Sequence, residues 1–102
     1  MSLKADIMKK LQEMRPALQQ RYAVTYIGLF GSVVREEEQA DSDVDILLDF
    51  DWEQPKLQGF DFLRLIDDLE LQLGKKVDVV TRSSLHPILK PQILAEAEEV
   101  LP

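Results

Sequence analysis

The chain has 102 residues, of which 45% are hydrophobic and 30% are charged, and it carries a formal net charge of −7 at pH 7 and no cysteine. This composition is typical of one globular domain, excludes disulfides and thiolate metal sites, and argues against direct nucleic-acid binding, which depends on Lys and Arg. No apolar run approaches the roughly 20 residues of a membrane span, so we expect a soluble, cytoplasmic protein.

The first half of the chain predicts two helices and two strands. Apolar residues recur at helical spacing over residues 3–20, with a kink or restart expected just before Pro16. Residues 22–30 are β-branched and aromatic and predict a strand, and residues 33–37 follow as a short helix. Residues 43–50 predict a second strand that is mostly apolar on both faces, which is typical of a central strand.

The second half predicts two further helices and one strand. Residues 62–73 form an amphipathic helix that Gly74 can end in a left-handed cap. Residues 75–81 predict a third strand, and Pro87 opens a last helix. The order α-β-(α)-β-α-β-α predicts a single α/β (α+β) domain over residues 1–102.

Three aspartates are expected to share one face of the sheet. Residues two apart on a strand project to the same side, so Asp43 and Asp45 point together while Val44 points away. Asp78 lies between two valines of the third strand, and it joins the pair if that strand lies beside the second. The sequence therefore predicts two adjacent carboxylates and one across from them.

Such a cluster favours a divalent cation. Two like charges about 5 Å apart repel by roughly 3 kcal/mol at an effective dielectric constant near 20, and burial adds to that penalty. Hard oxygen ligands select Mg²⁺ or Mn²⁺, which typically bind one or two carboxylates together with substrate phosphates. Two such ions could bind the attacking and leaving oxygens of a phosphoryl or nucleotidyl transfer.

A Gly-Ser pair provides a phosphate-binding turn. Gly31 allows the backbone to approach a phosphate closely, and the hydroxyl of Ser32, at the start of a short helix, adds a donor. Arg35, one turn further on, can reach the same anion.

Each of these residues also has a plainer interpretation. Asp43 can be a turn residue, Asp45 a solubilising strand-edge position, Asp78 a surface residue, and the Gly-Ser pair an ordinary turn. Each plain interpretation is favoured when taken alone, but all of them must occur together by chance in one short chain. The combination therefore favours a site.

Three other features carry less weight. A calcium loop beginning at Asp41 fails, because Ile46 and Trp52 stand where that loop needs glycine and glutamate. His86, the only histidine, precedes Pro87 and is better explained as a surface or capping residue than as a general base. Trp52 could stack on an adenine, although packing over a sheet edge is the commoner role of such a residue.

These motifs together resemble the DNA polymerase β-type nucleotidyltransferase superfamily. The short length is similar to its minimal nucleotidyltransferase (MNT) branch, which includes MntA-like antitoxins. The resemblance covers nearly the whole chain and is carried by the segments LFGS, SDVDILLDF, LGKKVDVVT and LHPILKPQILAEA. It implies the nucleotidyltransferase fold, a small mixed β-sheet of three to four strands flanked by helices.

The resemblance also implies roles for individual residues. Gly31 and Ser32 would hold the nucleotide phosphates, Asp43 and Asp45 would bind a pair of Mg²⁺ or Mn²⁺ ions, and Asp78 would complete the metal set and help activate the attacking hydroxyl. ATP is the implied nucleotide substrate. The implied partner is a HEPN-domain toxin that receives AMP on a tyrosine. The implied assembly is a homo-oligomer or a hetero-oligomer with the toxin.

Two hypotheses follow for the function. The first is a metal-dependent nucleotidyltransferase that moves AMP from ATP to a hydroxyl of a partner protein, as the antitoxin of a HEPN/MNT pair. The second is a catalytically weak MNT-fold module that neutralises the toxin by contact. Glu36 motivates the second, because it stands where the family usually has glycine and begins a run of three glutamates.

Overall fold

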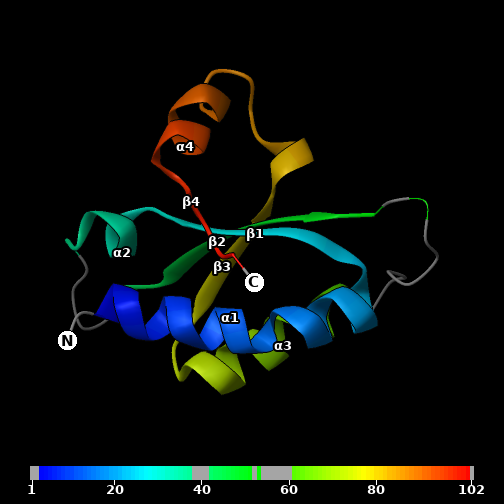
Figure 1. Ribbon diagram of the computed structural model, residues 1–102. Helices are drawn as coiled ribbons and strands as arrows, with labels where there is room; N and C mark the ends of the chain where they lie inside the picture. Colours follow the sequence, from blue (N-terminus) through cyan, green and yellow to red (C-terminus); the bar gives the residue numbers. More distant parts are fainter. Residues whose placement is uncertain (1–2, 38–41, 52, 54–60, 102) are drawn as a thin grey trace.

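The computed structural model describes residues 3–37, 42–51, 53 and 61–101 (Figure 1). The elements in chain order are α1 (Leu3–Tyr22), β1 (Val24–Phe30), α2 (Ser32–Arg35), β2 (Val44–Phe50), α3 (Asp61–Leu73), β3 (Val77–Thr81), the 3-10 turn η1 (Arg82–Ser84), α4 (Lys90–Glu96) and β4 (Glu98–Glu99). Every element predicted from the sequence has a counterpart in this order. Most boundaries agree within two residues, and the predicted left-handed cap is present, with Gly74 at φ +67°.

The strands of the described chain form one mixed sheet in the order β3-β2-β1-β4. β1 is antiparallel to both β2 and β4, whereas β2 and β3 are parallel. Parallel neighbours require a crossover connection, and α3 lies in that connection. β2 therefore lies inside the sheet, as its apolar faces predicted, and the expected mixed sheet of three to four strands is confirmed.

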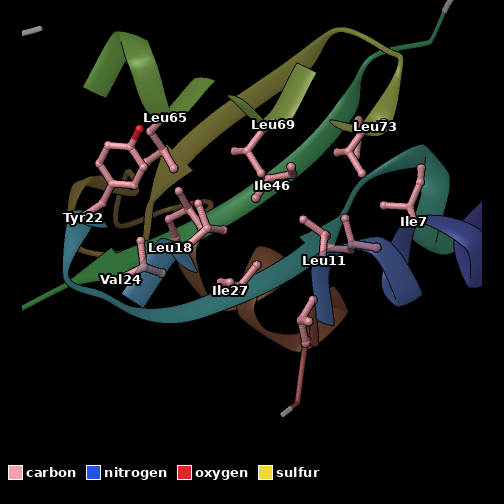
Figure 2. Close-up of a cluster of buried hydrophobic side chains, with 14 of the residues drawn as sticks. Ile7, Leu11, Leu18, Tyr22, Val24, Ile27, Ile46, Leu65, Leu69 and Leu73 are labelled. Atoms are coloured by element: carbon pink, nitrogen blue, oxygen red, sulfur yellow. The ribbon is translucent and has the colours of Figure 1, made fainter. Parts of the chain in front are cut away.

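The hydrophobic core lies between one face of the sheet and the helices α1 and α3 (Figure 1). Figure 2 shows Leu11 of α1 and Leu69 of α3 among the side chains that meet Ile27 and Ile46 from the two central strands. All four are fully buried, and each such aliphatic side chain contributes about 1.5–3 kcal/mol of transfer free energy. Because alternate residues face opposite sides of a strand, Asp45 projects from the other face.

The first helix continues through its proline. α1 runs from Leu3 to Tyr22 with Pro16 inside it, so the restart expected there does not occur. Leu11 and Leu18, on either side of the proline, are both buried in the core, and this packing holds the helix together despite the hydrogen bond that proline cannot make. No described helix combines the length and apolar character required to cross a bilayer.

The C-terminal segment differs most from the prediction. The last helix begins at Lys90 rather than at Pro87, because the backbone first turns back so that the N–H groups of Leu89 and Lys90 both donate to the carbonyl of His86. Pro91, not Pro87, then occupies the first helical turn. The last described element is β4, a two-residue strand that the sequence did not predict.

Candidate active site

Two of the predicted aspartates face each other across neighbouring strands. In the parallel ladder of β2 and β3, Asp45 is the register partner of Asp78. Adjacent strands are about 4.8 Å apart, so the two side chains leave the sheet side by side. Asp43 lies just before β2, two residues from Asp45. The predicted juxtaposition of the second and third strands is confirmed, and with it the shared face of Asp45 and Asp78.

The glycine of the Gly-Ser turn touches one of these carboxylates. β1 ends at Phe30, which is the register partner of Asp45, and the chain turns at Gly31 immediately afterwards. Gly31 is buried with φ +77°, and a Cβ atom built there would lie 2.0 Å from Oδ2 of Asp45. Only glycine fits this position, both for its backbone angle and for the space that the carboxylate occupies.

The electrostatic environment of Asp45 disfavours its charged form. Burial raises the pKa of this half-buried carboxyl, and the charges of Asp78 and then Asp43 raise it further, while Arg35 lowers it and Glu96 adds a smaller increase. No hydrogen bond within the described residues reaches the carboxylates of Asp43, Asp45 or Asp78. A bound cation would relieve both the repulsion and the desolvation.

The donor set fits Mg²⁺ or Mn²⁺ that is completed by other ligands. The available donors are carboxylate oxygens, which are the hard ligands that these ions prefer. Within the ranges that the structure describes, no three acidic or histidine side chains converge closely enough to hold an ion by themselves. The arrangement therefore suits ions that take one or two carboxylates from the protein and further oxygens from phosphate and water.

Arg35 lies at the end of α2 with two carboxylates around it. Its Nε donates to Glu37 at 3.1 Å, and its Nη1 donates to Glu96 at 2.5 Å. Its charge also acts on Asp45 and lowers the pKa of that carboxyl. The predicted placement of Arg35 beside the turn is thus present, together with a carboxylate partner that was not predicted.

That partner, Glu96, also binds the turn itself. The N–H of Gly31 donates to Oε1 of Glu96 at 3.0 Å, so this amide is already engaged. The Ser32 hydroxyl has no hydrogen-bond partner among the described residues. Sequence reasoning missed Glu96 because it lies 65 residues from Gly31 in an acidic tail, where any glutamate is expected to face solvent.

Glu36 has the backbone conformation for which glycine is best suited. It caps α2 with φ 58° and ψ 35°, which is the left-handed region. A side chain there costs about 1 kcal/mol relative to glycine. Glu36 is exposed, and its charge acts on Lys4 of α1 rather than on Asp45. The backbone of Glu36 is therefore strained, and its carboxylate does not join the aspartate cluster.

The remaining sequence candidates lie elsewhere. His86 is exposed, which confirms the surface alternative, and its Nδ1 accepts the N–H of Ile88 in the turn before α4, a helix that has no side-chain cap. Trp52 and Asp41 lie outside the described residues. A hollow of about 490 Å³ is lined by side chains of α1 and α3, and these helices cover the opposite face of the sheet from Asp45.

Comparison with known proteins identifies the class to which this fold and site belong. The family model described as a nucleotidyltransferase domain matches residues 11–100. The chain therefore belongs to the nucleotidyltransferase domain family.

Individual relatives and solved structures show which members of the family are similar to this chain. The protein adenylyltransferase MntA of Thermococcus cleftensis is 43% identical over 91 residues, which are 89% of each chain. A solved structure of a candidate minimal nucleotidyltransferase is 35% identical and superposes with a TM-score of 0.74, covering 96% of this chain and 95% of the other. A Shewanella oneidensis complex of an MNT antitoxin with a tri-AMPylated HEPN toxin shares the fold at 20% identity and a TM-score of 0.64, covering 93% of this chain and 71% of the other.

Proposed function

We propose that the chain is a metal-dependent adenylyltransferase that moves AMP from ATP to a hydroxyl group of a partner protein. The observation that carries the proposal is the register pairing of Asp45 with Asp78 directly beside the Gly31 turn. Its support from relatives is the adenylyltransferase MntA, which is similar along 89% of the chain.

The reaction assigns a task to each side chain. The acceptor oxygen attacks the α-phosphorus of ATP, the bond from that phosphorus to the bridging oxygen breaks, and pyrophosphate leaves with its electron pair. Asp78 takes the proton of the attacking hydroxyl. The Ser32 hydroxyl and the Arg35 guanidinium hold the phosphates that leave.

Asp43 and Asp45, with Asp78 completing the set, would hold the divalent cations. When bound, Mg²⁺ or Mn²⁺ neutralises charge on the phosphates and lowers the pKa of an oxygen that it contacts. Asp45 is suited to this role because burial and like charges raise its pKa, and because no hydrogen bond among the described residues reaches its carboxylate. A cation that binds Asp45 therefore does not have to displace a hydrogen bond from another described residue.

We further propose that the acceptor is a HEPN-domain toxin and that the protein acts as its antitoxin in the cytoplasm, where ATP is abundant. This part rests on the Shewanella oneidensis complex, in which a HEPN toxin carries AMP and is bound to an MNT antitoxin of the same fold. The acidic surface of this chain suits a partner with basic residues at its contact face.

Transfer of radiolabel tests the enzymatic proposal. Incubation with ATP labelled at the α-phosphate, Mg²⁺ and the protein encoded by the adjacent gene is expected to label that protein, and Asp43→Ala is expected to abolish the label. The matched control is Asp6→Ala, which removes an exposed carboxylate from the first turn of α1 and leaves transfer intact. Absence of label with the wild-type protein would contradict the proposal.

A second candidate function is neutralisation of the toxin by contact alone. The observation that favours it is the pairing of Arg35 with both Glu37 and Glu96, because a cation already bound by two carboxylates attracts phosphate less strongly. Under this hypothesis the double variant Asp43→Ala, Asp45→Ala still forms the complex and still suppresses toxin activity in a growth assay. If the double variant binds the toxin but growth stops, contact alone is insufficient.

A further inference from the structure

Glu96 connects the C-terminal segment to the phosphate-binding turn. One oxygen of its carboxylate, Oε1, accepts both the N–H of Gly31 at 3.0 Å and Nη1 of Arg35 at 2.5 Å. The side chain is only 20% exposed, in contrast to 48% for Arg35. Two donors of the turn are therefore fixed by one internal carboxylate.

The chain on both sides of Glu96 is anchored. On its N-terminal side, the last turn of α4 closes where the N–H of Ala97 donates to the carbonyl of Ile93. On its C-terminal side, Glu98 pairs with Leu29 in the sheet, and the fully buried Val100 donates to the carbonyl of Ile27 at 2.7 Å. Glu96 is thus built into the fold next to the end of β1, rather than carried on a free surface.

The contacts leave donors available for phosphate. A guanidinium has five N–H groups in one plane, and two of those of Arg35 are used by Glu37 and Glu96. Bonds on two sides of the group fix the orientation of its plane, so the remaining N–H groups are presented in a set direction. The bond from Gly31 likewise fixes the backbone that carries Ser32.

We infer that Glu96 is a positioning residue for the nucleotide: it holds Gly31 and Arg35 so that the Ser32 hydroxyl and the remaining guanidinium N–H groups meet the phosphates of ATP. The inference rests on the proposed adenylyltransferase function. A carboxylate at this place can have one of two opposite effects: it organises the phosphate site, or it competes with phosphate for the same donors. The anchoring of the segment on both sides favours organisation.

Binding and transfer kinetics of matched variants test the inference. ATP affinity is measured by calorimetric titration in the presence of Mg²⁺, and KM for ATP and kcat are measured in the transfer assay. Glu96→Ala is expected to raise Kd and KM about tenfold, in line with the loss of charge-assisted hydrogen bonds, with a smaller change in kcat. Glu96→Gln keeps an acceptor oxygen and is expected to recover about half of that loss on a logarithmic scale.

Glu99→Gln is the control, since it removes the same charge from an exposed position three residues further along the segment. It is expected to match the wild-type protein, and circular dichroism establishes that each variant is folded. Tighter ATP binding by either Glu96 variant would make Glu96 a competitor of phosphate and overturn the inference. Equal binding by the Glu96 and Glu99 variants would overturn it as well. If the wild-type protein binds no ATP, the proposed function itself fails.

Discussion

Asp45→Asn is expected to stabilise the metal-free protein at neutral pH while abolishing transfer. Burial and the charges of Asp78 and Asp43 raise the pKa of Asp45, so its ionised form opposes folding, and the neutral amide of the variant removes that penalty. Transfer should fall about 1,000-fold. Mutation of a residue that only hydrogen-bonds to a metal ligand already lowers metal affinity or activity by about 10- to 100-fold, and loss of the ligand itself should cost more.

The pH dependence of this effect has a definite sign. A carboxyl whose pKa is raised on folding favours the folded state below its unfolded pKa of about 4, and that contribution is lost as the pH rises through the folded pKa. The melting temperatures of Asp45→Asn and wild type should therefore converge in acid and separate towards pH 7. Each 1 kcal/mol of difference corresponds to about 4–8 °C in a domain of this size.

Asp43→Asn is the matched comparison for this experiment. Asp43 is exposed whereas Asp45 is half-buried, so the variant should lose transfer but gain little stability. Thermal unfolding in EDTA from pH 3 to pH 8, together with the transfer assay, measures both effects. A melting temperature of Asp45→Asn at pH 7 that is equal to or below that of wild type would show that Asp45 is not electrostatically strained.

Gly31→Ala is expected to be the most disruptive single-methyl change in the described chain. The new Cβ would lie 2.0 Å from Oδ2 of Asp45, and the residue would keep a φ near +77° that L-residues rarely adopt. Backbone strain of this kind costs about 1–3 kcal/mol, and displacement of the carboxylate adds to it. Urea unfolding should show the loss, and metal-dependent transfer should disappear in whatever fraction remains folded.

Gly74→Ala separates the cost of backbone strain from the cost of the clash with Asp45. Gly74 also has a positive φ, of +67°, but a Cβ there would meet nothing within 4 Å, so only the strain of about 1 kcal/mol remains. In addition, Asp45→Ala should reduce the cost of Gly31→Ala, because it removes the atoms that the methyl group meets. Equal losses for Gly31→Ala and Gly74→Ala, or no coupling with Asp45→Ala, would refute the predicted clash.

Local patterns were sufficient to predict most of the fold and the aspartate cluster. The apolar run behind Asp45 correctly indicated a central strand, whereas the common face of Asp43 and Asp45 stays a prediction because Asp43 lies just before that strand. Asp78 was predicted to join the site only if the third strand lay beside the second, because a sequence does not state which strands are neighbours. The parallel ladder of β2 and β3 shows that they are. The metal roles of these residues stay a prediction.

What the sequence could not predict depends on contacts between distant segments. β4 consists of two glutamates, whose poor strand propensity is overridden by backbone pairing with β1. The role of Glu96 follows from the same pairing, which brings an acidic tail back to the turn at Gly31. Pro16 shows the converse, because core packing maintained one helix where local propensity predicted a kink or a restart.

The register pairing of Asp45 with Asp78 makes assembly of the candidate site depend on the crossover connection between β2 and β3. The two residues belong to strands separated in the chain by α3, and a parallel pair cannot form until that helix has crossed over the sheet. A chain in which β2 and β3 have not yet paired therefore lacks the adjacent carboxylates of Asp45 and Asp78. Under the proposed function, nucleotide transfer would therefore begin only in molecules in which β2 and β3 have paired.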